Sequence, residues 1–326
     1  MTKNVLGIGN ALTDMLVDTS DEKLTEFELP KASMQLVDAA RMGDLMQKLG
    51  EACNERRCAG GCASNTITGL GEMGIQTAFI GKIGPDPIGE FFEQDLISHR
   101  VESRLLRSET PSGTALALIT PDGERTFATH LGAAVELTAD ELTDEMFLGA
   151  DFFHIEGYLV QNHALIATAI EKAKAAGSTV SIDLAAYNVV EQHRVFLQGL
   201  LGKGLDVVFA NEDEARIFTE TDDEQQALDA LAECCSVAVV KIGAGGSLLA
   251  RDGERVHVPV DPVDPVDTTG AGDLFAAGFL YGLVHDRPLE QCGRIGSLLA
   301  REIIQVVGTK LPPANWQRLM AAIEAP

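Results

Sequence analysis

The sequence predicts a doubly wound α/β fold, in which a mostly parallel sheet carries helices on both faces, together with a small β subdomain. Short, continuously apolar segments are typical of strands that are buried on both faces. Helical patterns lie between these segments, and two regions interrupt the alternation. The predicted strands are Val5–Gly9, Thr77–Gly81, Asp151–Ile155, Val180–Leu184, Val207–Ala210 and Val237–Ile242.

The predicted helices follow from apolar residues spaced three and four positions apart. In the middle of the chain this spacing predicts helices over His163–Ala176 and Glu224–Cys235. Near the C-terminus it predicts two packing helices, Leu289–Val307 and Ala314–Ala325, with a glycine- and proline-containing break at Gly308–Pro313 between them.

The two irregular regions predict a small β lid made of residues 11–39 and 111–133. In the second region, GTALALIT and ERTFATH flank the turn Pro121-Asp122-Gly123, so Ser112–Gly132 is expected to form a hairpin. Edge strands of the main sheet are the alternative. Because the hairpin has few apolar residues to bury, we expect it to be mobile. The α/β core takes residues 1–10, 40–110 and 134–326.

The composition limits the classes of protein to which this chain can belong. The 326 residues are 45% hydrophobic and 23% charged, which is typical of a globular chain with a full core. The formal net charge of -24 argues against nucleic acid or an anionic membrane surface as a partner. No apolar run reaches the ~18 residues of a membrane span, and the N-terminus lacks a signal-peptide pattern, so we expect a cytoplasmic location. The six cysteines show no zinc-site spacing and are expected to be reduced thiols.

A glycine-rich loop leads into an apolar helix in the segment DPVDTTGAGDLFAAGFL, residues 264–280. The first N–H groups of a helix lack internal partners and lie at the positive end of its dipole, so Gly270–Gly272 would let a phosphate approach them. A carboxylate directly after such a site, Asp273, suits a base that deprotonates the attacking hydroxyl. The alternative is an ordinary helix start, capped by Thr269 and with Asp273 stabilised by the dipole.

Two common nucleotide-binding motifs are absent from the sequence. No GxxxxGK[ST] occurs, because Gln76 stands where the first glycine is needed and Ile83 follows the Gly-Lys pair. The segment GIGNAL, residues 7–12, does not complete GxGxxG. These absences weigh against a P-loop enzyme and against an NAD-dependent oxidoreductase.

Two separated motifs resemble the signatures of the ribokinase-type (PfkB) carbohydrate kinase family, which includes the adenosine kinases. DTTGAGDLFAAGF, residues 267–279, resembles the C-terminal signature. AGGCASNTITGLGEMGIQTAFIGKIGPDPIGEFF, residues 59–92, resembles the N-terminal one, in the family's order and at its separation. The resemblance implies a ribokinase-like fold, with a small β-sheet lid over the active site.

The resemblance also implies roles for individual residues. Asp273 resembles the catalytic base, and Gly270, Ala271 and Gly272 resemble the anion hole. The residues that resemble the substrate-binding positions are Asn10, Asp14, Gly60, Gly61 and Asn65. The alternative for Asn65 is a helix cap or an early helix residue.

On the nucleotide side, Asn211 and Glu214 resemble the family's Asn-x-x-Glu motif, in which Glu214 would organise Mg²⁺ through water. An ordinary helix N-terminus is the alternative. Gly243 and Gly246 match a glycine pair that approaches ATP. Lys241 stands where several members have threonine, and it either contacts phosphate or pairs with a surface acid.

The leading hypothesis is therefore an ATP- and Mg²⁺-dependent kinase that phosphorylates a hydroxymethyl group of a nucleoside or sugar. Adenosine is favoured because the segment IDLAAYN, residues 182–188, lacks the Asp-Pro-Asn stretch of many sugar kinases, and because LGAA, residues 131–134, resembles the adenosine-kinase branch. A base also needs an apolar slot. The lid residues expected to supply this slot are Leu36, Leu116, Leu118 and Phe127.

Several alternatives remain open. One is a sugar or sugar-acid kinase acting on ribose, fructose or 2-keto-3-deoxygluconate, and another is a non-catalytic sensor of a sugar or nucleoside. The resemblance also allows a potassium ion near the anion hole and a homodimer that pairs through the lid.

Overall fold

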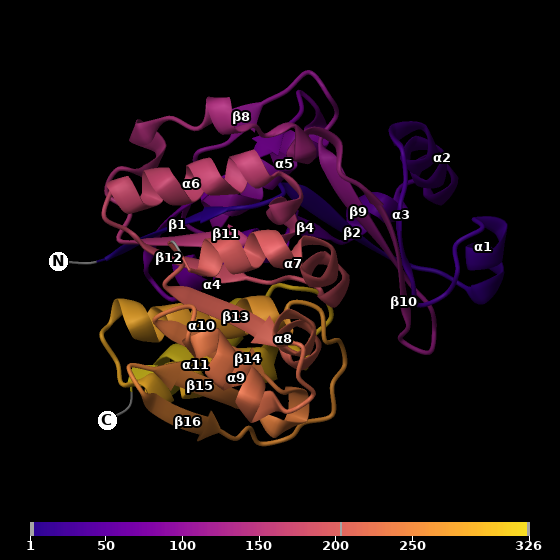
Figure 1. Ribbon diagram of the computed structural model, residues 1–326. Coiled ribbons are helices and arrows are strands. Elements are labelled where there is room, and N and C mark those ends of the chain that lie inside the picture. The colour runs from indigo at the N-terminus through magenta and orange to yellow at the C-terminus, as the bar shows by residue number, and fades with distance from the viewer. Residues whose placement is uncertain (1–2, 203, 325–326) are drawn as a thin grey trace.

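A nine-stranded sheet forms the centre of the computed structural model, which describes residues 3–202 and 204–324 (Figure 1). Its neighbouring strands are parallel except at one edge, where the pairings β14–β15 and β15–β16 are antiparallel. The six predicted strands are confirmed with ends within one residue. In spatial order the strands are β16 (Glu254–Val258), β15 (Ser247–Arg251), β14 (Val237–Lys241), β13 (Val207–Asn211), β12 (Thr179–Asp183), β11 (Phe152–Glu156), β1 (Asn4–Ile8), β5 (Gln76–Ile80) and β7 (Val101–Ser103).

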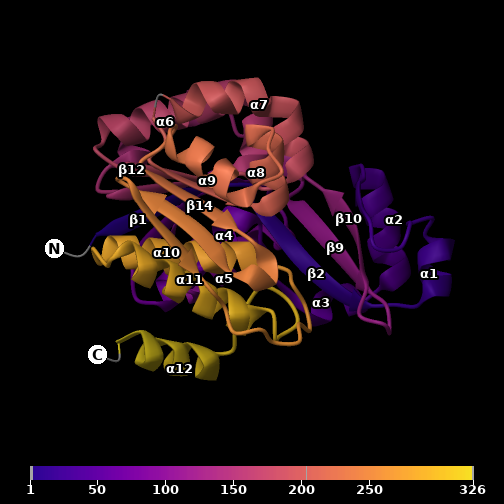
Figure 2. The same cartoon turned by 60° about the horizontal axis from the view of Figure 1, so that its bottom comes forward.

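Helices cover both faces of this sheet because its strands are apolar on both sides (Figure 2). In β13, Phe209 packs with one layer of helices and Val208 with the other. The first layer contains α4 (Cys62–Glu72), α5 (Pro87–Ser98), α10 (Ala271–Val284), α11 (Leu289–Ile303) and α12 (Pro313–Glu324). The second contains α6 (His163–Ala175), α7 (Tyr187–Leu201), α8 (Glu212–Thr219) and α9 (Glu224–Ala232). The doubly wound prediction is confirmed.

Helix α11 ends four residues before the predicted boundary at Val307. The carbonyl of Ile304 accepts hydrogen bonds from the N–H groups of Val266 and Asp267, at 2.7 and 3.1 Å. The N–H of Gly308, which a longer helix would direct to that carbonyl, donates to Oδ2 of Asp267 at 2.6 Å. A distant loop therefore ends the helix. The predicted end of the last helix, at Ala325, lies outside the described residues.

A separate five-stranded sheet projects from the core (Figures 1 and 2). The predicted hairpin over 112–132 is confirmed, and it belongs to this sheet, so the alternative of an edge on the main sheet is wrong. In spatial order the strands are β3 (Met34–Leu36), β10 (Arg125–His130), β9 (Gly113–Ile119), β2 (Leu12–Asp18) and β4 (Arg57–Gly60). Three helices accompany them: α1 (Asp21–Glu26), α2 (Ala39–Leu49) and α3 (Ala52–Glu55).

Residues 40–60 belong with this small sheet, whereas we expected them in the α/β core. Strand β4 pairs with β2, and Met42 and Leu45 of α2 are buried in the small sheet's own hydrophobic cluster. That cluster also buries Leu116 and Leu118 of β9, so the expectation of a hairpin with little to bury is wrong. Apolar spacing predicts a buried helix face but does not identify the sheet that it covers.

The remaining described elements are short connections. They are β6 (Lys82–Ile83) and β8 (Leu106–Arg107), which pair with each other, and the 3₁₀ turns η1 (Gly132–Glu136), η2 (Ala139–Glu141), η3 (Asp144–Phe147), η4 (Gly157–Gln161) and η5 (Gly243–Gly245).

Candidate active site

Polar residues gather at the carboxyl ends of the central strands, beside the small sheet. Asn10 follows β1, Glu156 ends β11, Asp183 ends β12, Asn211 ends β13 and Lys241 ends β14. Because neighbouring parallel strands end at the same edge of a sheet, these side chains from distant parts of the chain lie along one edge. Helix α10 brings the glycine-rich loop to the same edge.

The glycine-rich loop enters α10 through Gly270, whose φ of +78° is the left-handed conformation that glycine adopts without strain. No side chain caps the helix. The hydroxyl of Thr269 instead accepts a hydrogen bond from Arg125, so the capping alternative is wrong. The N–H of Ala271 closes a turn on the carbonyl of Thr268 at 3.2 Å. A Cβ on Gly272 would lie 3.1 Å from Nζ of Lys241, which places a positive charge against the loop.

Asp273 lies in the first turn of α10 and is held by α4. Its Oδ2 accepts a hydrogen bond from Nδ2 of Asn65 at 2.9 Å, and its backbone carbonyl accepts one from the hydroxyl of Thr66 at 3.1 Å. Burial raises the pKa of Asp273 to about 6, and the bond from Asn65 opposes this rise. A carboxylate with a pKa near neutrality is suited to accept a proton.

Asn65 is the fourth residue of α4 and does not cap the helix, which begins after Gly61. It is an early helix residue, as the alternative supposed, but its side chain crosses to α10 and contacts Asp273. Asn65 was predicted on the substrate side. In the structure it orients the predicted base.

Asp14 approaches the backbone of β4 at Gly60, where a Cβ would lie 2.2 Å from its carboxylate. Gly60 therefore makes room for Asp14. Burial raises the pKa of Asp14 to about 7; the charge of Lys310 opposes the rise, and that of Asp273 adds to it. These two charges act on Asp14 because it lies in the same site as the predicted base.

Asn10 is buried and its amide donates to Oε1 of Glu156 at 2.6 Å. The other oxygen of Glu156 accepts from the N–H of Ala63 at 3.3 Å. Burial raises the pKa of Glu156 to about 7. Gly61, with φ of +86°, passes so close that a Cβ would lie 2.4 Å from the carbonyl oxygen of Asn10. The two predicted glycines, Gly60 and Gly61, thus support Asp14 and Asn10.

Lys241 forms an ion pair with Asp183, with Nζ 2.7 Å from Oδ2. Asp183 is buried, so the alternative of a surface partner is wrong. Burial alone would lower the pKa of Lys241, but Asp183 and Glu214 outweigh it and raise the pKa well above its usual range. Lys241 therefore keeps a positive charge next to the loop before α10.

A cavity of about 460 Å³ adjoins Lys241 and the loop. Asn211, Gly243 and Gly246, which were predicted to lie on the nucleotide side, line it. A Cβ on Gly246, where φ is +95°, would lie 2.0 Å from the carbonyl oxygen of Val258, so this glycine is also needed for the turn. An apolar wall that suits a purine base consists of Val260, Val263, Phe275, Ala300 and Ile304.

Asn211 and Glu214 form a capping box at the start of α8. The N–H and the amide of Asn211 donate to the two oxygens of Glu214 at 2.8 and 2.7 Å. Glu214 is buried and does not line the cavity, whereas its neighbour Glu212 does. Among the described residues no group of three or more His, Cys, Asp and Glu could hold a metal ion. Glu214 therefore acts as a helix cap, which was the alternative for this motif. Asn211 and Glu212 are the residues of the motif that face the cavity, where a Mg²⁺ ion would arrive with the nucleotide phosphates.

Arg125 connects the small sheet to the glycine-rich loop. Its Nη2 lies 2.5 Å from Oδ2 of Asp267, and its Nη1 donates to the hydroxyl of Thr269 at 3.0 Å. Asp267 is buried and also accepts hydrogen bonds from the N–H groups of Thr269 and Gly308. One carboxylate therefore joins three segments of the chain at the predicted anion hole.

Comparison with known proteins identifies the family. The family model described as "pfkB family carbohydrate kinase" matches residues 39–316. The chain belongs to this family. It is 34% identical to the adenosine kinase from Sinorhizobium meliloti, whose structure it matches with a TM-score of 0.87 over 99% of this chain and 100% of that one.

Two curated relatives have different substrates in their names. Adenosine kinase 2 of Arabidopsis thaliana is 28% identical over 94% of this chain and 95% of its own length. The fructokinase of Klebsiella pneumoniae is 29% identical over 70% of this chain and 77% of its own length. The protein is thus a kinase, a phosphotransferase with a hydroxyl group as acceptor, of the adenosine-kinase-like branch of the ribokinase-type family.

Sequence reasoning missed four charged residues that lie in this candidate site: Glu156, Asp183, Arg125 and Lys310. A signal existed for the first two, because Glu156 directly follows the predicted strand Asp151–Ile155 and Asp183 is the last residue but one of the predicted strand Val180–Leu184. The carboxyl ends of parallel strands meet at one edge of a sheet. Arg125 and Lys310 carry no such signal, since they lie in a hairpin and in a loop.

Two of the four residues predicted for the apolar slot lie on the face of the small sheet that carries Asp14, and two do not. Across the small sheet, Asp14 is paired with Ala115, Ala115 with Thr129, and Thr129 with Leu36, so these side chains lie on one face. Phe127, two residues before Thr129 in the same strand, shares that face. Leu116 and Leu118 point to the opposite face and are fully buried in the small sheet's own core. They cannot contact a substrate beside Asp14.

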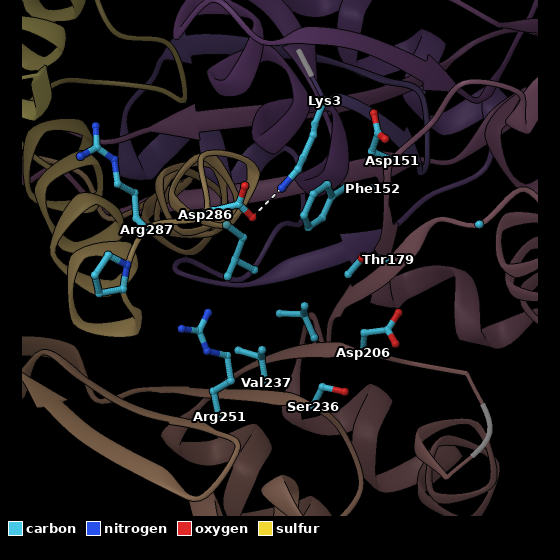
Figure 3. A pocket seen from close by; sticks show the side chains of 14 residues that line it. Lys3, Asp151, Phe152, Thr179, Asp206, Ser236, Val237, Arg251, Asp286 and Arg287 are labelled. Atoms are coloured by element: carbon cyan, nitrogen blue, oxygen red, sulfur yellow. Dashed lines mark hydrogen bonds and ion pairs between the residues drawn. The ribbon is translucent and has the colours of Figure 1, made fainter. Parts of the chain in front are cut away.

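A second cavity, of about 920 Å³, opens at the amino ends of the strands (Figure 3). Its walls include Lys3 and Asp286, which form an ion pair at 2.6 Å, and Asp206, which pairs with Lys174. None of the predicted site residues lines it.

No helix in residues 3–202 and 204–324 has the length and apolar character to cross a bilayer.

Proposed function

We propose that this kinase transfers the γ-phosphoryl group of ATP to a hydroxymethyl group of a nucleoside, with adenosine as the first candidate. The observation that carries the proposal is the apolar strip of the small sheet beside Asp14, which includes Leu36 and Phe127. A purine base needs such a wall next to the site that binds the sugar hydroxyls. The 34% identity to an adenosine kinase over nearly the whole chain supports the same choice.

The proposed mechanism uses the chain's own groups around the acceptor hydroxyl. Asn10 and Asp14 hold the sugar hydroxyls, and Asp273 accepts the proton as the hydroxyl attacks. The loop Gly270–Gly272 and the ammonium of Lys241 stabilise negative charge that develops on the transferred group. ATP supplies this group, and a Mg²⁺ ion bound with it would neutralise its phosphates. Asn211 would meet that ion through water, and Glu214 holds the Asn211 amide in place.

The small sheet is proposed to close over the acceptor. Its Arg125 contacts Asp267 and Thr269 directly before the anion-binding loop, so closure and the arrangement of that loop are linked. Closure excludes water from the reaction and prevents loss of ATP by hydrolysis. The homodimer through the small sheet and the potassium ion near the loop stay predictions.

A sugar or sugar-acid kinase is the second candidate, because a fructokinase also matches 70% of the chain. A non-catalytic sensor is disfavoured because Asp273 is present and its pKa lies near neutrality. Measurement of kcat/KM for adenosine, ribose, fructose and 2-keto-3-deoxygluconate, from ADP release, tests the proposal. We expect adenosine to lead. A free sugar preferred by more than about tenfold, or about 1.4 kcal/mol of transition-state binding, would overturn the nucleoside assignment and leave phosphoryl transfer intact.

A further inference from the structure

A small cavity lies directly behind the residue that orients Asp273. Its volume is about 10 Å³, and residues of helices α4 and α10 and of the loop that follows α11 line it. Asn65 and Thr68, one turn apart on α4, contribute to its wall, and Lys310 reaches it from the loop. The other lining residues are Gly69, Glu72, His99, Leu274, Thr309, Leu311 and Trp316.

Three buried polar atoms from these walls have no hydrogen-bond partner among the described residues. They are Oδ1 of Asn65, Oγ1 of Thr68 and Nζ of Lys310. A buried polar atom without a partner is costly, and such atoms are rare in folded proteins. Three of them around one cavity indicate a shared partner, and the volume is close to the minimum that admits a single water molecule.

We propose that one water molecule occupies this cavity and that Lys310, through it, is a positioning residue for the base. The donors and acceptors match. The ammonium of Lys310 donates to the water oxygen, and the two water hydrogens go to Oδ1 of Asn65 and Oγ1 of Thr68. The water then makes three hydrogen bonds, which is usual for a buried one.

The water determines which end of the Asn65 amide faces the base. With Oδ1 bound to the water, Nδ2 points to Oδ2 of Asp273, where the structure has it at 2.9 Å. A reversed amide would direct an oxygen at the Asp273 carboxylate and an N–H₂ group at the water, and both contacts would suffer. The link from Lys310 to Asp273 therefore passes through three hydrogen bonds, one water molecule and one rigid amide.

Lys310 also acts on the acceptor site. It contributes the largest favourable charge at Asp14, where it lowers a pKa that burial raises. One ammonium thus serves both the base and the residue proposed to hold the sugar hydroxyls. This inference rests on the proposed function of Asp273, but the water site itself does not.

The first test measures the kinetics of variants that remove or keep the hydroxyl of Thr68. Thr68→Val keeps the shape of the side chain and removes one water partner, so we expect kcat to fall about three- to tenfold, the effect of one net hydrogen bond, with KM for the acceptor unchanged. Thr68→Ser, which keeps the hydroxyl, should have the kcat of the wild type. Thr77→Val is the matched control, because Thr77 is buried with an unpartnered hydroxyl but lies in β5, outside the cavity.

A double-variant cycle provides the second test. Lys310→Met should lower kcat and also raise KM, since Lys310 faces Asp14 as well. Adding Thr68→Val to it should lower kcat no further, because both variants remove the same water. Additive losses in kcat, or a Thr68→Val variant that matches the Thr77→Val control, would overturn the inference. If Lys310→Met fails to fold, the two Thr68 variants decide alone.

A crystal structure of the unliganded protein separates this inference from the proposed function. We expect a water within about 3.2 Å of all three atoms in the wild type, and its loss or displacement in Thr68→Val. A dry cavity refutes the inference even if the kinase phosphorylates adenosine. A water in place, together with a wild type that phosphorylates no acceptor, refutes the proposed function and leaves the water site standing.

Discussion

At the scale of single residues, Asp273 combines a carboxylate that can accept a proton with a hydrogen bond from Asn65. Asp273→Asn keeps the contact with Asn65 but removes the proton acceptor, so we expect kcat to fall by about 10²–10⁴-fold, the usual effect of a lost general base. Binding of ATP and of the acceptor, measured calorimetrically, should change little, and the melting curve should stay the same. A variant that retains more than about a tenth of wild-type turnover would show that Asp273 is not the base.

The same residue predicts how activity depends on pH. Asp273 must be deprotonated to accept a proton, and its pKa is raised to about 6, so kcat/KM should decline as the pH falls through that value. The charge of Asp183 contributes to the raised pKa. Asp183→Asn should therefore move the acid limb of the profile to lower pH. A limb that stays in place, or moves upward, would contradict the electrostatic account of the site.

At the scale of elements, the start of α10 depends on the absence of a side chain at Gly272. Gly272→Ala would place a Cβ 3.1 Å from Nζ of Lys241, the flexible end of a long side chain. The fold can adjust, but the ammonium must move away from the transferring phosphoryl group. We expect kcat to fall at least about tenfold, with an unchanged melting temperature.

The control for Gly272→Ala is Gly199→Ala in α7, where a Cβ meets no atom within 4 Å. That variant should gain about 0.5–1 kcal/mol of stability, because alanine favours the helix, and should keep its kcat. An equal loss of activity in both variants, or unfolding of Gly272→Ala, would make Gly272 structural.

The small sheet predicts a pattern of hydrogen exchange. Its own core protects the β9–β10 ladder at all times, so substrate should slow exchange mainly in the edge strand β3 and in the turn before Arg125. Met34 and Leu36 of β3 are 56% and 64% exposed, which leaves apolar surface to be covered on closure. Arg125→Ala should remove most of this protection. Identical exchange with and without saturating acceptor would reject a closing lid.

At the scale of the whole molecule, the site costs stability. Burial raises the pKa values of Asp14, Glu156 and Glu214 from 3.8, 4.5 and 4.5 to about 7. Below about pH 7 the folded chain therefore binds more protons at these groups than the unfolded chain does, so the free energy of unfolding falls as the pH rises. His154, whose pKa burial lowers to about 4, acts in the opposite direction only below pH 6.5.

We expect the melting temperature of the unliganded protein to decrease between about pH 6 and 8, as calorimetry can measure. Glu156→Gln should make this decrease shallower because it removes one of the titrating groups. This change in slope is expected even if the substitution also raises or lowers the melting temperature at every pH. Glu254→Gln, at an exposed position, should leave the slope unchanged. A melting temperature that rises with pH over this range would contradict the buried-acid account.

Features that depend on neighbouring residues could be predicted from the amino-acid sequence. Continuously apolar runs predicted the central strands within one residue, Pro121-Asp122-Gly123 predicted the hairpin turn, and the glycine-rich loop led to Asp273 as the candidate base. Each of these features is set by local backbone preferences or by the start of a single helix. The family resemblance rested on the same local motifs.

The contacts between distant groups could not be predicted from the sequence, because they depend on how the whole chain packs. Asn65 and Asp273 are 208 positions apart, and Arg125 and Thr269 are 144 apart. Helix α11 ends early because a loop from elsewhere takes its carbonyl, and α2 covers the small sheet because that sheet offers the matching apolar face. A sequence pattern shows that a face is apolar or that a group needs a partner. The partner is selected by packing, since any complementary surface in the chain satisfies the same local pattern.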